Sequence, residues 1–289
     1  LASLLAQQYD VIEVAASDGV IGEQDQPALA LRQKPRASIV VSTGLVKKGL
    51  ADASVTMGST GGAMAAAAVV LGVIDGIDRP ALGGPIMGLA PRTVIVDLGA
   101  NVDCRPAQLL GFAVIGDVFA RQFWGVERPR VALLSVGGES GKGNRQVREA
   151  TELIAAAGLN FIGNVEANDL PQSVADVAIC DGFVGNIVMK LTEGFGSAMA
   201  DHLRDRLDGK LPATELEGLV REVYALNNVA ETYGGGPLFG VNGVSVVGHG
   251  RGRAGAVRRA IGTAKMSVEV GLVSELNEEL ARIKQVAGG

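Results

Sequence analysis

The sequence predicts an α/β fold: a doubly wound, mostly parallel sheet between two layers of helices, forming an α/β/α sandwich. Short apolar segments rich in β-branched residues alternate with helical stretches of ten or more residues, an order that favours crossover connections and parallel strands. The 41 glycines among 289 residues are spread along the chain, as expected for many tight turns. With 47% hydrophobic residues the chain can bury a sizeable core, and we expect a single domain over residues 1–289.

Six apolar segments have the length and composition of strands. Residues 131–136, VALLSV, are almost uninterrupted by polar residues, which is typical of a strand buried on both faces of a parallel sheet. Residues 93–98, TVIVDL, have a similar composition. In chain order, the expected strands are residues 9–16, 53–57, 93–98, 131–136, 174–180 and 244–247.

Helices are expected between these strands, and several carry a start signal. Pro27 and Pro106 stand at first turns, where proline is favoured, and Asn144 is placed to cap the helix that follows it. The small apolar residues of 61–74 predict a buried helix that is too short to span a bilayer. The expected helices are a short one from Pro27, residues 37–49, 61–74, 106–123 and 145–157, a long one from about Ile187, a helical tip or dimer segment at about 205–235, and two C-terminal helices.

Polar, glycine-rich loops follow the strands. Loops after the carboxyl ends of parallel strands collect at one edge of a sheet, where ligands bind, so we expect five of these loops to converge on one cleft. The candidate site residues in them are Gly58, Ser59, Thr60, Gly61, Asp97, Asn101, Asp103, Lys142, Asn144, Asp181, Gly185, Asn186 and His249.

The loop at residues 137–144, GGESGKGN, is the strongest single signal. Its four glycines can present backbone N–H groups without obstruction, Lys142 adds a positive charge, and a helix start follows at Asn144. This combination predicts an anion site, most simply for phosphate. An ordinary strand-to-helix turn with a solvated lysine is the alternative reading of the same residues.

Charge and cysteine content exclude some classes of function. The net charge is −5, and no stripe of Lys and Arg with interleaved aromatic residues is present, so we expect no nucleic-acid partner. Cys104 and Cys180 lie far apart without a C-x-x-C motif. They suit a reducing cytoplasm, where such cysteines behave as small buried hydrophobic residues more often than as nucleophiles.

Several familiar motifs fail on their context. Residues 250–255 match the string G-x-G-x-x-G, but no second strand ending in an acid follows, and the GK at 141–142 lacks the Ser or Thr of a P-loop. There is no G-x-S-x-G elbow, and the chain has two histidines, which leaves little for a Ser-His-Asp triad to draw on. Three loop aspartates have no His or Cys at ligand spacing, so we expect neither a metal nor a cofactor: Asp97, Asp103 and Asp181.

Together these loops resemble the bacterial phosphate acyltransferases, the PlsX family of phospholipid synthesis. The similarity covers most of residues 28–271, with the motifs in the family's order: VTMGSTGGAM, DRPAL, VDLGANVDCRP, ERPRVALLSVG, GKGN, FIGNVEANDL and VADVAICDGFVGNIVMKLTEG. The resemblance implies transfer of a long-chain acyl group from acyl carrier protein to inorganic phosphate. The acyl phosphate would then serve a glycerol-3-phosphate acyltransferase.

The resemblance also implies an architecture and a setting. The fold would be related to phosphotransacetylases and isocitrate-dehydrogenase-like enzymes, and the protein would be a homodimer without a cofactor. It would be cytoplasmic and loosely attached to the inner face of the cell membrane.

Roles for the site residues follow from the resemblance and from the chemistry. Phosphate is itself a nucleophile, so catalysis needs positioning and stabilisation of the thioester oxygen rather than a serine or cysteine. Lys142 would neutralise phosphate or the developing oxyanion, and Asn186 would hydrogen-bond to the carbonyl or phosphate. Backbone N–H groups of residues 58–62 and the hydroxyls of Ser59 and Thr60 would hold phosphate. The loop residues expected to shape the pocket are Asp97, Asn101 and Asp103, while His249 is either a proton relay or a packed histidine.

Three features depart from the family pattern. Ser59 stands where the family generally has Asn, and the family's N-terminal strand and Asp/Gly-rich loop would precede Leu1, so we expect the natural N-terminus to lie outside this sequence. The segment 208–232 carries one modest apolar face, expected to be dimer core or a weak membrane anchor. This face consists of Leu216, Leu219, Val220, Val223 and Leu226.

Three other functions stay open at this stage. The first is a phosphate acetyl- or butyryltransferase-like enzyme that uses acyl-CoA. The second is an oxidoreductase that binds NAD at residues 250–255. The third is a catalytically impaired relative that binds acyl carrier protein.

Overall fold

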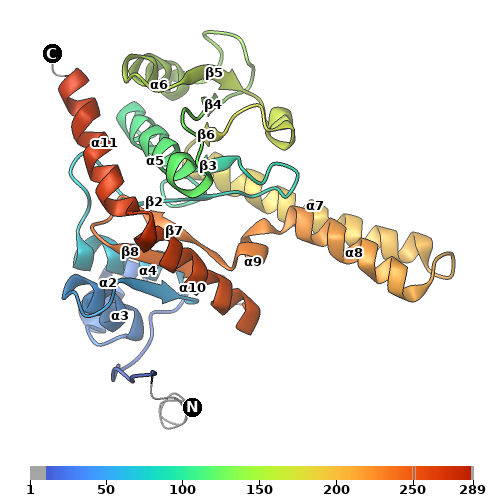
Figure 1. Cartoon of the computed structure of the whole chain (residues 1–289), viewed down its shortest axis with the longest axis horizontal. Helices are drawn as coiled ribbons and strands as arrows, with labels where there is room; N and C mark the ends of the chain where they lie inside the picture. The colour runs from blue at the N-terminus through green and yellow to red at the C-terminus, as the bar shows by residue number, and fades with distance from the viewer. Residues whose placement is uncertain (1–10, 249, 251, 288–289) are drawn as a thin grey trace.

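The computed structural model describes residues 11–248, 250 and 252–287. In these residues one eight-stranded sheet runs through the molecule, with helices on both faces (Figure 1). Its strand order is β1-β8-β7-β2-β3-β6-β4-β5. The strands are β1 (Ala53–Thr56), β2 (Ala81–Gly84), β3 (Val94–Val96), β4 (Val131–Leu134), β5 (Phe161–Val165), β6 (Val177–Ile179), β7 (Gly235–Phe239) and β8 (Val244–Gly248).

The sheet combines two parallel groups that run in opposite directions. β3, β6, β4 and β5 pair in parallel, and so do β1 and β8. Between the groups, β8 pairs antiparallel with β7, β7 with β2, and β2 with β3. Most pairs are parallel, which confirms the predicted fold class. Because of the three antiparallel pairings, the two parallel groups run in opposite directions. The sequence pattern did not predict this feature.

Helices fill the predicted positions along the chain. They are α2 (Pro27–Gln33), α3 (Ser38–Lys47), α4 (Thr60–Ala66), α5 (Pro106–Trp124), α6 (Arg145–Ala156), α7 (Gly182–Leu207), α8 (Ala213–Asn227), α9 (Val229–Tyr233), α10 (Ala254–Glu269) and α11 (Leu272–Ala287). A π-helical turn, Ala67–Leu71, continues α4, and a 3₁₀ helix, Ala167–Gln172, follows β5. The strand expected at 9–16 is wrong for residues 11–16, which pair with no strand, and its first two residues lie outside the described part.

Apolar layers cover both faces of the sheet around β3. Successive residues of a strand point to opposite faces. Val96 packs into the cluster that contains Phe112 and Phe119 of α5, whereas Ile95 packs into a second cluster with Met189 of α7 beside it. Helices α5 and α7 therefore cover opposite faces, and the loops that start both helices come from neighbouring strands.

Helices α7 and α8 form a hairpin that projects from the body (Figure 1). Leu216 and Val220 of α8 are buried against Ala200 of α7. Two residues of the apolar face that was expected to be dimer core or a membrane anchor are therefore buried within the chain itself. No helix in residues 11–248, 250 and 252–287 combines the length and hydrophobicity that crossing a membrane requires.

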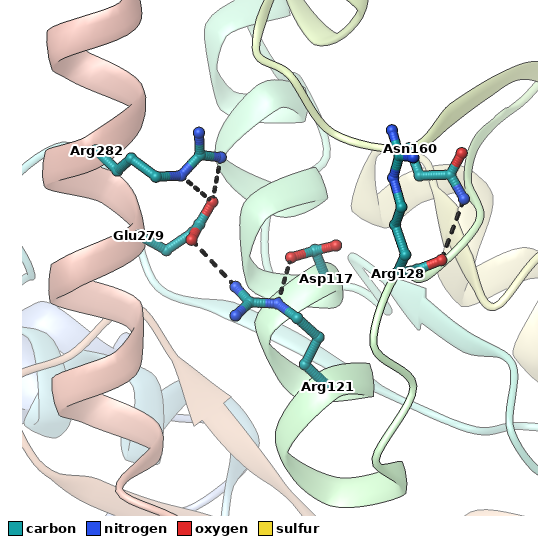
Figure 2. Close-up of polar contacts among 6 residues, drawn as sticks. All are labelled: Asp117, Arg121, Arg128, Asn160, Glu279 and Arg282. Carbon is teal, nitrogen blue, oxygen red and sulfur yellow. Dashed lines mark hydrogen bonds and ion pairs between the residues drawn. The ribbon is translucent and has the colours of Figure 1, made fainter.

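Figure 2 shows a polar network that joins α11 to α5. Arg121 Nε donates to Asp117 Oδ2 at 2.8 Å, and Arg121 Nη2 lies 3.2 Å from Glu279 Oε2. Arg282 also donates to Glu279, with 3.0 Å between Nε and Oε1. Burial raises the pKa of Asp117 despite its contact with Arg121. In a separate contact, Asn160 Nδ2 donates to the Arg128 carbonyl at 3.1 Å.

Candidate active site

A cavity of about 880 Å³ lies over the antiparallel strands at the middle of the sheet. Its size is in the range of small-molecule sites. Polar side chains from several elements line it: Glu23, Thr60, Asn186, Lys190, Glu193, Tyr233, Arg259 and Thr263. Gly58 and Gly99 line it as well. The rest of the lining is mainly apolar or glycine.

The cavity joins loops that start from opposite edges of the sheet. Since β8 and β3 run in opposite directions, the loop after β1 leaves one edge and the loops after β3, β4 and β6 leave the other. The expectation that all loops meet at one edge is therefore wrong. Thr60 and Asn186 nevertheless line the same cavity, because the cavity spans the short strands between the two edges.

Asn186 lies in the first turns of α7, next to the loop that follows β3. A Cβ on Gly99 would stand 3.4 Å from Asn186 Oδ1, so the two residues are in close proximity. Gly182 N donates to the Asn101 carbonyl at 2.6 Å. Any Cβ at Gly185 would collide with the Asp97 carbonyl, so only glycine allows α7 to approach this closely. The role of Gly185 is therefore to let α7 pack closely enough to place Asn186 beside this loop.

Asp97 organises the loop between β3 and α5. Its Oδ1 accepts from Leu82 N at 3.0 Å and Ala100 N at 3.1 Å, and its Oδ2 accepts from Asn101 N at 2.6 Å and Asn101 Nδ2 at 2.9 Å. Burial raises the pKa of Asp97, and these hydrogen bonds lower it in part. Asn101 Nδ2 also donates to the Pro80 carbonyl. Both side chains shape the loop, whereas Asp103 is exposed on it.

Three candidate residues use their side chains as helix caps. Ser59 Oγ accepts from Gly62 N at the start of α4, with 3.2 Å between them. Asn144 Oδ1 accepts from Val147 N at 2.9 Å, and Asp181 Oδ1 accepts from Val184 N at 2.8 Å. Each satisfies a backbone donor of the first helical turn. Ser59, Asn144 and Asp181 are absent from the cavity lining, as is Gly61.

Lys142 is exposed in the loop after β4 and does not line the cavity. Gln146 Nε2, in the first turn of the helix after this loop, donates to the Cys104 carbonyl in the loop after β3 at 2.6 Å. Two polar atoms at this loop, Ser135 Oγ and Asn164 Oδ1, are buried without a hydrogen-bond partner in the described part of the chain. Buried polar atoms are rarely left unpaired. His249 lies outside the described residues.

The structure adds a cation that the sequence analysis missed. Lys190 lines the cavity one helical turn beyond Asn186, and its Nζ lies 2.7 Å from Glu193 Oε2. Residues four apart share one face of a helix. That spacing, in the motif that contains Asn186, is the signal that could have identified Lys190.

The two cysteines are unsuited to nucleophilic chemistry. Burial raises the pKa of Cys104 to about 12, and it also raises the pKa of Cys180. A thiolate is therefore scarce at neutral pH. Within residues 11–248, 250 and 252–287, no group of three or more His, Cys, Asp or Glu is placed to hold a metal ion.

Comparison with known proteins identifies the family. Residues 2–275 match the family described as "Fatty acid synthesis protein". The phosphate acyltransferase of Pelotomaculum thermopropionicum is 42% identical over 283 residues, covering 96% of this chain and 82% of that protein. The phosphate acyltransferase of Moorella thermoacetica is 45% identical over 275 residues, covering 92% and 80%.

Solved structures share the fold. A phosphotransacetylase from Streptococcus pyogenes matches with a TM-score of 0.55 at 22% identity, covering 83% of this chain and 68% of that one. The EutD phosphotransacetylase of Staphylococcus aureus matches with a TM-score of 0.53 at 19% identity, covering 91% and 83%. The predicted relation to the phosphotransacetylase fold is confirmed. The chain belongs to the fatty acid synthesis protein family, alongside these phosphate acyltransferase relatives.

Proposed function

We propose that this protein transfers a long-chain acyl group from acyl carrier protein to inorganic phosphate. The product, an acyl phosphate, would serve a glycerol-3-phosphate acyltransferase in phosphatidic acid synthesis. Family membership supports the phosphate acyltransferase reaction. The observation that carries the proposal is one cavity that combines Asn186 and Lys190 with a largely apolar lining.

The reaction needs few groups from the protein. A phosphate oxygen attacks the thioester carbonyl carbon, and the carbonyl oxygen becomes an oxyanion. When that intermediate collapses, the carbon–sulfur bond breaks and the thiolate takes up a proton. Lys190 offers a charge for phosphate, and the Asn186 amide can donate to the oxyanion. Direct attack by phosphate also agrees with the raised pKa of both cysteine thiols.

Lys142 keeps its proposed role as a second cation for phosphate or the oxyanion. Support comes from its glycine-rich loop, the link from Gln146 to Cys104, and the two unpaired polar atoms at the loop. Thr60, which also lines the cavity, is proposed to contact phosphate through its hydroxyl.

The test measures free acyl carrier protein released from a long-chain acyl thioester, with and without phosphate. We expect phosphate-dependent release by the wild type and a loss of roughly a hundredfold or more in kcat for Asn186→Ala. Lys190→Ala should raise the KM for phosphate. The matched control is Lys48→Ala, an exposed lysine just after α3, which should leave release unchanged.

The same assay with Lys142→Ala and with a CoA donor separates the alternatives. Loss of activity in Lys142→Ala would support its role, and full activity would leave Lys190 as the operative cation. Faster turnover of acyl-CoA than of the carrier-protein thioester would favour a phosphotransacetylase-like enzyme. Binding of acyl carrier protein without any turnover would contradict the catalytic proposal.

We also propose a homodimer formed through α7. Five large apolar side chains at four-residue spacing form an exposed stripe on this helix: Phe183, Ile187, Leu191, Phe195 and Met199. Full burial of an exposed side chain of this kind contributes about 1.5–3 kcal/mol, and these five are 36–69% exposed, so covering them with a second copy would contribute part of that amount for each. A loose contact of this dimer with the inner face of the cell membrane remains part of the proposal.

A further inference from the structure

The cavity has an apolar end on the face of the sheet opposite Asn186. Phe119, Phe123 and Trp124 of α5 line this end, together with Met266 of α10, whereas Arg259 and Thr263 of the same helix add polar groups to the lining. Phe119 belongs to the apolar cluster of Val96, on the face covered by α5. The polar lining from α7 belongs to the other face. One continuous cavity therefore reaches both faces of the sheet.

Glycines occupy the lining between the two ends. The β2–β7 ladder pairs Ala81 with Phe239 and Leu82 with Leu238, and beyond it the lining includes Gly83 and Gly84 from β2 and Gly235 and Gly236 from β7, with Pro85 and Pro237 beside them. A Cβ at Gly84 would meet no atom within 4 Å, so that position faces open space, whereas a Cβ at Gly83, Gly235 or Gly236 would lie within 3.0 Å of a neighbouring atom. The opening past the strands is therefore at Gly84.

The apolar end is a preformed wall. The rings of Phe119 and Phe123 stack with centroids 4.3 Å apart, and Phe119 meets Trp124 edge to face at 5.2 Å. Such contacts hold the rings in fixed positions, as is usual in sites for apolar ligands. A ligand that reaches both ends needs a polar reacting group and a long, thin, flexible apolar tail.

We propose that the acyl chain of the thioester runs from Asn186 past Gly84 and ends against Phe123, Trp124 and Met266. The inference rests on the proposed function for the identity of the chain. It adds a binding site for the hydrocarbon, distant from the reacting carbonyl. Each methylene added within this site should tighten binding by up to about fourfold, until the chain reaches the aromatic wall.

Trp124 makes the site directly observable, because it is the single tryptophan of the sequence. A long-chain fatty acid with two bromine atoms at mid-chain quenches tryptophan fluorescence at close range. With the full chain in the absence of phosphate, we expect saturable quenching by this acid. A brominated acid of three carbons should not quench at the same concentration.

The matched variants are Thr263→Phe, which fills the apolar end, and Ile261→Phe on the same helix, outside the cavity and 55% exposed. Thr263→Phe should weaken long-chain quenching roughly tenfold or more, and Ile261→Phe should not change it. Neither variant adds a tryptophan. Circular dichroism spectra matching the wild type would show that both are folded.

Two results would overturn the inference: no long-chain quenching in the wild type, or equal affinity in the wild type and a folded Thr263→Phe. The wild-type result decides the matter even if Thr263→Phe does not fold. Failure of the proposed function is distinguishable, because it would appear as saturable quenching without phosphate-dependent thioester cleavage.

Discussion

Asp97 illustrates how a buried acid can build a site without reacting in it. Four hydrogen bonds reach its two oxygens, from Leu82, Ala100 and Asn101. These bonds fix the loop that brings Gly99 against Asn186. The carboxylate therefore holds this loop in place, and its expected role in shaping the pocket stays a prediction.

Replacing Asp97 with alanine should remove the hydrogen bonds that hold this loop. The substitution leaves four donors unpaired, and each buried unpaired group costs about 1–3 kcal/mol. We expect a fall of at least about 3 kcal/mol in the free energy of unfolding, measured by urea denaturation. Asp103→Ala, at an exposed position of the same loop, is the control and should change stability by less than about 0.5 kcal/mol. Equal effects of the two substitutions would contradict this account.

The residue types in the sequence were enough to locate the loops, but they did not show which side chains within a loop line the cavity. Two of the candidate residues, Asn186 and Thr60, line the cavity. Three other polar candidates from similar loop positions cap helices instead: Ser59, Asn144 and Asp181. A polar residue after a strand can bind a ligand or cap the following helix, and both uses favour the same residue types. Only the folded geometry separates them.

At the scale of the element, the helix caps lead to a prediction about two substitutions of the same residue. Asp181 caps α7, the helix that carries Asn186 and Lys190, through a bond from Val184 N. Asp181→Ala should lower the free energy of unfolding by roughly 1 kcal/mol, because the helix loses that bond. Asp181→Asn should retain nearly full stability, since the amide oxygen can accept from the same N–H. Thermal unfolding of both proteins checks this, and equal destabilisation would show that the charge, not the cap, is what matters.

The sequence did not predict β2, β5 or β7. Two of these strands, β2 and β7, have little side-chain pattern. β2 reads ALGG and β7 reads GGPLF, and glycine and proline normally argue against a strand. In this fold they form the antiparallel centre that reverses the sheet. Strands with apolar, β-branched runs, such as β3, β4 and β6, were predicted because burial on both faces imposes a composition. Strand direction leaves no such mark.

The network of Figure 2 gives the contact between α5 and α11 a pH dependence. Burial raises the pKa of Asp117, so its folded form holds the proton more tightly than the unfolded chain does. The resulting stabilisation is present below the unfolded pKa of about 4 and is lost as the pH rises through the folded pKa. Asp117→Asn lacks this titration. Relative to wild type, the variant should therefore gain stability as the pH rises from about 3.5 to 7.

Urea denaturation of both proteins at several pH values measures this difference in slope, and the common background of other groups cancels. The ionised carboxylate of Asp117 attracts Arg121, and this contact opposes the effect of burial on the slope. If the variant instead lost stability relative to wild type as the pH rose, the contact with Arg121 would outweigh burial. The Asp117 pKa would then lie below its usual value.

At the scale of the whole molecule, α7 combines the reaction and the proposed assembly. Asn186 and Lys190 line the cavity, while Leu191 and Phe195 in the same helix are 69% and 61% exposed. An exposed row of large apolar side chains is unusual on a monomer and marks an interaction surface. Covering this row with a second copy would also restrain the helix that carries the proposed catalytic side chains.

Phe195→Glu tests that coupling, because a charge within a dimer interface is strongly unfavourable when unpaired. Light scattering should report a dimer for the wild type and a monomer for the variant. Val69→Glu, at a site 72% exposed on another helical segment, should remain a dimer. Because Phe195 lies about one and a half turns from Lys190, a loss of turnover that accompanies dissociation would show that assembly supports the site. A wild-type monomer, or a Phe195→Glu dimer, would refute the proposed interface and leave the stripe without its proposed partner.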